Sequence, residues 1–105
     1  MRIGELAKVA DADIDTIRYY EKIGILAAPA RSAGNYRLYT VDHLERLKFI
    51  RRCRSLDMTI DEIRVLLRFR DAPEADCEQV NHLLDEHIGH VTARIAALTQ
   101  LEKEL

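Results

Sequence analysis

Two histidines near the C-terminal end of this sequence have the spacing of a metal-binding pair. His87 and His90 are three residues apart, so a helix would place both imidazoles on one face. Such a pair can chelate Zn(II), and Glu86 or Glu62 would supply an oxygen ligand. The alternative is that His87 flanks an apolar helix face while His90 is solvated. The pattern therefore predicts either a histidine-rich metal site or an ordinary helix surface.

The two cysteines, Cys53 and Cys77, are too few for a disulfide framework. We expect thiols in a reducing compartment and place the protein in the cytoplasm. Cys53 shares a spacing of three with apolar residues, which predicts a buried thiol that acts as a small hydrophobic group. Cys77 comes just before a long helical pattern, and the partial positive charge of a helix N-terminus stabilises a thiolate.

Basic and aromatic residues in the first two thirds of the chain indicate a different chemistry. The net charge of −2 divides into +4 over residues 1–70 and −6 over residues 71–105. Residues 31–54 carry seven Lys and Arg against two acidic residues. Such a stripe suits a polyanion, and the alternative is a solvated helix face. No run approaches the ~18 apolar residues of a membrane span, so no membrane partner is expected.

These side chains need elements that position them, and the apolar spacing predicts which. We expect helices over residues 3–10, 14–22, 42–56, 60–70 and 76–105, with a hairpin over residues 31–39. Asp13 is the expected N-cap of the second helix, whose inner face would carry Ile14 and Ile17. Thr59 and Glu62 have the spacing of a capping box. Two short helices followed by a hairpin rich in Arg and Tyr are typical of a winged helix-turn-helix.

The last helix has a narrow apolar seam with polar faces around it. About 30 residues make roughly 45 Å of helix, which is longer than a 70-residue domain is wide. We therefore favour a homodimeric coiled coil over packing against the N-terminal domain. The seam consists of Leu84, Ile88, Val91, Ile95, Leu98, Leu101 and Leu105.

The predicted fold class is mainly α, with a winged helix-turn-helix domain over residues 1–71, then a linker and a dimerisation coiled-coil helix over residues 72–105. On the second helix, Thr16 and Tyr19 would face outward with hydroxyls for phosphates or base edges, and Arg18 can make bidentate contacts to either. Wing contacts to the DNA backbone are expected from Arg31, Asn35, Tyr36 and Arg37. Arg51 and Arg54 of the third helix are further candidates.

The motifs Thr16-Ile17-Arg18-Tyr19-Tyr20-Glu21 and Arg31-Ser32-Ala33-Gly34-Asn35-Tyr36-Arg37-Leu38-Tyr39 resemble the MerR family of transcription regulators. The resemblance implies a homodimer that binds a palindromic operator in double-stranded promoter DNA and distorts that DNA for RNA polymerase. It also assigns Thr16, Arg18, Tyr19 and Tyr20 to DNA. The Tyr20 ring has an alternative role, packing under the wing.

Within this family, the position of Cys77 supplies a thiolate to a metal site that the partner subunit completes. The pattern most resembles the branch that senses Cd(II) and Pb(II), and sensors of Zn(II) and Hg(II) are close to it. Soft thiolate ligands fit such metals, and no organic cofactor is expected. Related sensors carry two further cysteines in a loop beyond the long helix, and this chain stops at Leu105 without them. The chain is therefore a truncated form, or its sensing function is impaired, or other ligands complete the site. We favour truncation.

These residues and motifs leave three functions to weigh. The favoured one is a metal-responsive transcription regulator, with Cys77, His87 and His90 as candidate metal ligands. An architectural winged-helix module without an effector is the alternative, although such modules usually lack a dimerisation coil. A thiol enzyme using Cys77 with His82 or His87 is disfavoured, because no glycine-rich phosphate loop or oxyanion motif is visible. We therefore expect a protein that is not an enzyme.

Overall fold

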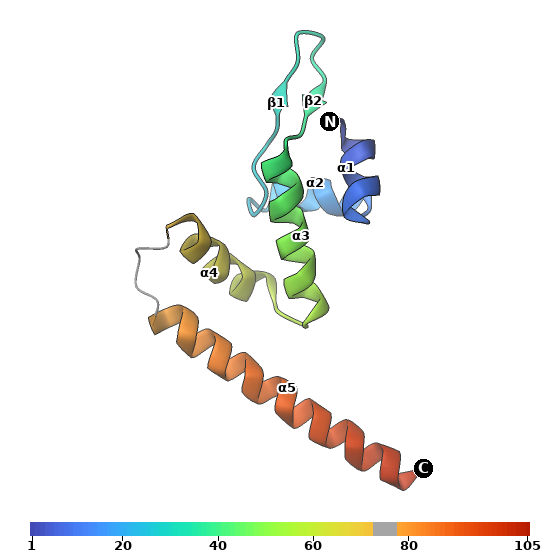
Figure 1. Cartoon of the computed structure of the whole chain (residues 1–105), viewed down its shortest axis with the longest axis vertical. Helices are drawn as coiled ribbons and strands as arrows, with labels where there is room; N and C mark the ends of the chain where they lie inside the picture. The colour runs from blue at the N-terminus through green and yellow to red at the C-terminus, as the bar shows by residue number, and fades with distance from the viewer. Residues whose placement is uncertain (73–77) are drawn as a thin grey trace. The chain divides into compact units, whose positions relative to one another are not determined.

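The computed structural model describes residues 1–72 and 78–105 and contains two compact units, Met1–Asp57 and Met58–Leu105. The first unit holds α1 (Ile3–Ala10), α2 (Ile14–Lys22), β1 (Ala30–Arg31), β2 (Arg37–Leu38) and α3 (Val41–Ser55), and the second holds α4 (Ile60–Asp71) and α5 (Glu78–Glu104) (Figure 1). This order confirms the predicted mainly helical fold with a wing.

The predicted boundary after residue 71 does not coincide with the boundary between the compact units. The structure groups α4 with α5, because these two helices are in contact. A division at residue 71 therefore stays a prediction about where the DNA-binding part ends.

The first unit has a core in which α1 packs against both α2 and α3. Leu6 of α1, Ile17 of α2, and Leu47 and Ile50 of α3 are completely buried. Each buried side chain of this size contributes about 1.5–3 kcal/mol to stability. Together these residues hold the three helices in one arrangement, which is what a rigid helix-turn-helix requires.

The start of α2 departs from the expected pattern. Asp13 precedes the helix in an extended conformation, as predicted, but its side chain makes no capping hydrogen bond. Ile14 is 37% exposed, so its assignment to the inner face was wrong. The buried residues of α2 are Ile17 and Tyr20, one turn further along, because the contact face of the helix is centred there.

The wing is a two-stranded antiparallel hairpin formed by β1 and β2. Ala30 pairs with Leu38 and Arg31 with Arg37. The turn depends on Asn35, whose φ of 65° lies in the left-handed region that asparagine tolerates. The hairpin is thus the predicted one, and its strands are only two residues long.

In the second unit, α4 begins with the predicted capping box. The Thr59 hydroxyl accepts a hydrogen bond from the Glu62 amide (3.2 Å), and the Glu62 carboxylate accepts one from the Thr59 amide (2.8 Å). Ile63 and Leu67 of α4 and Val80 of α5 are buried. The second unit therefore has a small apolar core between α4 and the start of α5.

Most of α5 leaves its apolar side chains in contact with solvent. Ile88, Ile95 and Leu98 are each about three-fifths exposed. A row of aliphatic side chains at this spacing is the pattern of a helix that packs against another helix. Among the described residues, no helix is both long and apolar enough to cross a membrane. The predicted seam residues Leu84, Ile88, Val91, Ile95, Leu98, Leu101 and Leu105 are all exposed.

Candidate DNA-binding surface and metal-binding helix

The outward face of α2 carries polar groups suited to DNA. Arg18 and Tyr19 are exposed, and Thr16 is partly exposed beside them. Tyr19 stands with its ring edge-on to Tyr20, with 6.1 Å between the ring centroids. A hydroxyl, a phenol and a guanidinium on one surface can bond to phosphates and to base edges.

Tyr20 is placed differently from its neighbours. It is 9% exposed, and its backbone carbonyl accepts hydrogen bonds from the amides of Ile25 and Leu26. This burial corresponds to the packing role that the sequence left open. Contact between Tyr20 and DNA stays a prediction.

Three of the four candidate wing residues, Arg31, Asn35 and Tyr36, are exposed. The Arg31 Nη1 donates to the Asn35 carbonyl across the turn (3.3 Å). The guanidinium of Arg2 lies 3.8 Å from the centre of the Tyr36 ring, which is a cation–π contact. The tip of the wing is therefore basic and locally ordered.

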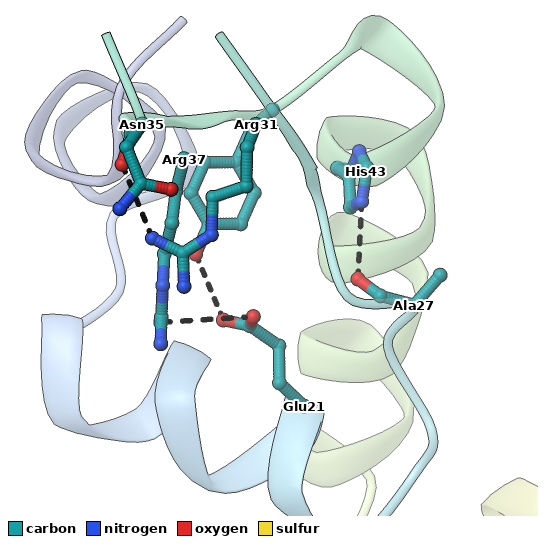
Figure 2. A network of polar contacts seen from close by, with 7 residues as sticks. Glu21, Ala27, Arg31, Asn35, Arg37 and His43 are labelled. Carbon is teal, nitrogen blue, oxygen red and sulfur yellow. Dashed lines mark hydrogen bonds and ion pairs between the residues drawn. The ribbon is translucent and has the colours of Figure 1, made fainter.

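The fourth wing residue, Arg37, is turned toward α2. Its Nη1 lies 3.8 Å from the Glu21 Oε1, and the Tyr39 hydroxyl donates to the Glu21 Oε2 at 2.8 Å. Figure 2 shows Glu21 of α2 with the Arg37 side chain directed at it. Burial raises the pKa of the Tyr39 phenol, and the hydrogen bond to Glu21 adds to the shift. Glu21 thus links α2 to the wing.

The base of the wing is bonded to α3. The His43 Nε2 lies 3.1 Å from the Ala27 carbonyl, and the His43 Nδ1 lies 3.1 Å from the Thr40 amide (Figure 2 shows the Ala27 contact). Arg46 donates from Nε to the Ile25 carbonyl at 2.8 Å. Sequence reasoning missed both these residues and Glu21. The only local signal was the position of His43, three residues after Thr40, where a capping box would place Glu.

Further along α3, the cysteine is buried and the two candidate arginines are at least partly exposed, as expected. Cys53 is buried, and desolvation raises the pKa of its thiol, which confirms its interpretation as a small hydrophobic group. Arg54 is exposed and Arg51 is partly exposed. Contacts of these arginines with phosphates stay predictions.

The predicted metal ligands are only partly within the described residues, because Cys77 lies outside them. His87 points toward α4, where its Nδ1 is 3.6 Å from the Glu62 Oε2. His90 is exposed, and His82 lies 4.0 Å from Glu86. Within residues 1–72 and 78–105, no group of three or more metal-ligating side chains is assembled.

The Glu62 carboxylate has two partners, one on each oxygen. One oxygen accepts from the Thr59 amide, and the other faces His87. Hydrogen bonding from the Thr59 backbone is the main cause that lowers the pKa of Glu62, and the nearby His87 and His90 contribute. Glu62 therefore joins the start of α4 to the histidine-bearing part of α5.

Comparison with known proteins supports the same class of molecule. The family model described as "MerR HTH family regulatory protein" matches residues 1–70, and the one described as "MerR, DNA binding" matches residues 44–105. The chain belongs to the MerR family of helix-turn-helix transcription regulators.

Three similar proteins are regulators of transcription, and the structure of one of them contains lead(II). The transcriptional regulator ZntR of Escherichia coli K12 is 45% identical over 99% of this chain and 74% of that protein, and a ZntR homolog of Haemophilus influenzae is 44% identical over 100% and 78%. The lead(II) complex of the regulator PbrR691 from Ralstonia metallidurans CH34 is 57% identical over 99% of this chain and 81% of that one, with a TM-score of 0.82. These relatives are regulators of transcription, a class distinct from enzymes.

Proposed function

We propose that this chain is a metal-responsive regulator that binds promoter DNA as a homodimer and controls the access of RNA polymerase to that promoter in the cytoplasm. The observation that carries the proposal is the combination of two surfaces. One is the polar, exposed face of α2 beside a basic wing, and the other is the exposed apolar seam of α5. The face of α2 with the wing suits a DNA duplex, and the seam of α5 suits another copy of the chain.

The seam supports a dimer because its apolar side chains are exposed in the described part of the chain. The helix α5 has 27 residues, which corresponds to about 40 Å at 1.5 Å per residue. Leu98 and Leu101 near its end are 59% and 54% exposed. Pairing two such helices buries both seams, and it places two DNA-binding units in one molecule for a palindromic operator.

The DNA-binding surface divides into base-reading and phosphate-binding parts. Arg18, Tyr19 and Thr16 on α2 are the residues proposed to enter the major groove. The wing residues Arg31, Asn35 and Tyr36 are proposed to bind phosphates. Arg37 is also proposed to face the backbone, although its guanidinium is shared with Glu21.

The effector is proposed to be a soft divalent metal ion. Cys77 would supply a thiolate, which favours Cd(II), Pb(II), Zn(II) or Hg(II) over hard cations. The lead(II) complex of a 57% identical regulator supports Pb(II) as the first ion to test, and Cd(II) is proposed beside it because soft thiolate ligands suit both ions. His87 and His90 are proposed as a second, nitrogen-rich site with Glu62 nearby. The partner subunit is proposed to supply the donors that complete the site of Cys77.

The test uses the full chain and a duplex selected from a random DNA library. Metal is added to the DNA complex, and DNA distortion is followed by chemical footprinting while transcription by RNA polymerase is measured on the same site. We expect Cd(II) or Pb(II) to change both, and a Cys77→Ser variant to bind DNA without this response. A duplex complex that none of the four metals changes would favour the architectural module instead.

A further inference from the structure

The wing cannot hold its own orientation. Its two strands contribute two residues each, and a hairpin of this size is marginal without support from packing. At its tip, Arg31, Asn35 and Tyr36 are exposed. The angle between the wing and α2 is therefore set by contacts outside the hairpin. Glu21 supplies some of them through Arg37 and Tyr39. Others lie where the wing leaves the helical core, at Ala27 on the entering side and Thr40 on the leaving side.

One side chain reaches both of these points. The His43 ring, from the first turn of α3, has its Nε2 3.1 Å from the Ala27 carbonyl and its Nδ1 3.1 Å from the Thr40 amide. A carbonyl only accepts and an amide only donates, so the ring must carry its hydrogen on Nε2 and a lone pair on Nδ1. The neutral Nε2–H tautomer satisfies both partners at once.

The second capping box of the chain shows that helix capping alone does not require histidine. At the start of α4, Glu62 occupies the same position relative to Thr59 and accepts from its amide at 2.8 Å. A carboxylate there caps the helix but has no hydrogen to donate to a carbonyl. The imidazole of His43 adds the one function that Glu62 lacks, which is a bond to the chain entering the wing.

We propose that His43 is a positioning residue for DNA binding, because it ties both sides of the wing base to α3 and so sets where the wing meets the duplex. This inference rests on the proposed DNA-binding function. His43 itself need not touch DNA. Its effect is transmitted through Ala27 and Thr40 to the wing residues.

The test compares three variants for affinity to the selected duplex. His43→Gln keeps an acceptor for Thr40 and a donor for Ala27, whereas His43→Glu keeps only the acceptor and so preserves the cap. Val41→Glu is the matched control, because Val41 is 67% exposed in the same first turn and adds the same charge without contacting the wing base.

We expect His43→Glu to bind about tenfold more weakly than Val41→Glu, since one hydrogen bond is lost in each of two wings. His43→Gln should stay within about twofold of the unaltered protein. Both variants should unfold cooperatively, and the midpoint of His43→Glu should lie only slightly below that of Val41→Glu, because both retain the cap and only the bond to Ala27 is lost.

Amide hydrogen exchange supplies a readout that needs no DNA. The Tyr39 amide donates to the Met1 carbonyl at 2.7 Å, and the Ser32 amide to the Tyr36 carbonyl at 2.8 Å. Both should exchange faster in His43→Glu than in Val41→Glu. Equal affinity and equal exchange in these two variants would overturn the inference. If the unaltered protein bound no duplex, the proposed function would fail, and exchange would still decide whether His43 holds the wing.

Discussion

Shortening Leu98 to alanine should weaken dimerisation of the chain by a predictable amount. The Leu98 side chain is 59% exposed in one subunit, and complete burial of a leucine is worth about 1.5–3 kcal/mol. If dimerisation covers the exposed part, each subunit gains about 1–1.8 kcal/mol from it. Two copies of the substitution therefore cost the dimer about 2–3.5 kcal/mol, which raises the dissociation constant about 20- to 300-fold.

Sedimentation equilibrium over a series of protein concentrations measures this constant directly. Gln100→Ala is a suitable control, because residue 100 lies about 200° around the helix from residue 98 and so on the opposite face. The control should dissociate like the unaltered protein. If Leu98→Ala and Gln100→Ala had the same dissociation constant, the seam would not be the dimer interface, and the arrangement of paired DNA-binding units would be wrong.

Three further predictions concern single side chains. Arg31→Ala should reduce the slope of log affinity against log salt concentration by about 0.9 for each subunit, as measured by fluorescence anisotropy of a labelled duplex, because one phosphate contact is lost; an unchanged slope would place Arg31 away from the backbone. Glu62→Gln should lower the unfolding midpoint near pH 7 by the equivalent of about 1 kcal/mol, a typical value for a helix cap. The folded state lowers the pKa of Glu62 below its ordinary value of 4.5. The stabilisation by the Glu62 carboxylate is therefore complete above pH 4.5 and is lost as the pH falls through the lowered pKa of the folded state. A stability difference between the unaltered protein and Glu62→Gln that persisted at pH values of about 2 would contradict the capping role of the carboxylate. In a Cys77→Ser background, Cys53 should react with a thiol reagent only at the rate of unfolding, because burial raises the pKa of its thiol; rapid labelling of the folded protein would show that Cys53 is accessible.

Local signals in the sequence were sufficient for most of the helices and for the hairpin. The bounds of α1 and α2 agree with those expected, and α3 is shifted by one residue. The Thr59 and Glu62 spacing predicted the start of α4, since both partners of a capping box lie within one turn. Such features depend on residues that are close in the chain, and the sequence therefore displays them directly.

Contacts between distant residues were not visible in the same way. Glu21 bonds to Tyr39, 18 residues away, and His43 bonds to Ala27, 16 residues away. Polar side chains that join separate elements have no characteristic period, so spacing alone cannot pair them. Ile14 shows the reverse problem, because an apolar residue at the right spacing lies where the neighbouring helix no longer covers it.

The prediction of DNA-contacting residues is limited for a related reason. The sequence indicated a basic wing, but only the structure shows that Arg37 shares its guanidinium with Glu21 and that Tyr20 is buried. Residue type predicts what a group can bond to, while its neighbours decide how much of that capacity remains for DNA.

The plain aliphatic character of the α5 seam has a consequence for the cell. Coiled coils choose among partners mainly through a buried polar residue or flanking charges, and the seven seam positions hold only Leu, Ile and Val. Mixed species with other regulators that carry a similar helix are therefore resisted only by the charges beside the seam. Where the genes of two such regulators are expressed together, subunit exchange would produce heterodimers. In each heterodimer, one DNA-binding unit would match one operator and the other unit a different operator, and the abundance of heterodimers would depend on gene dosage.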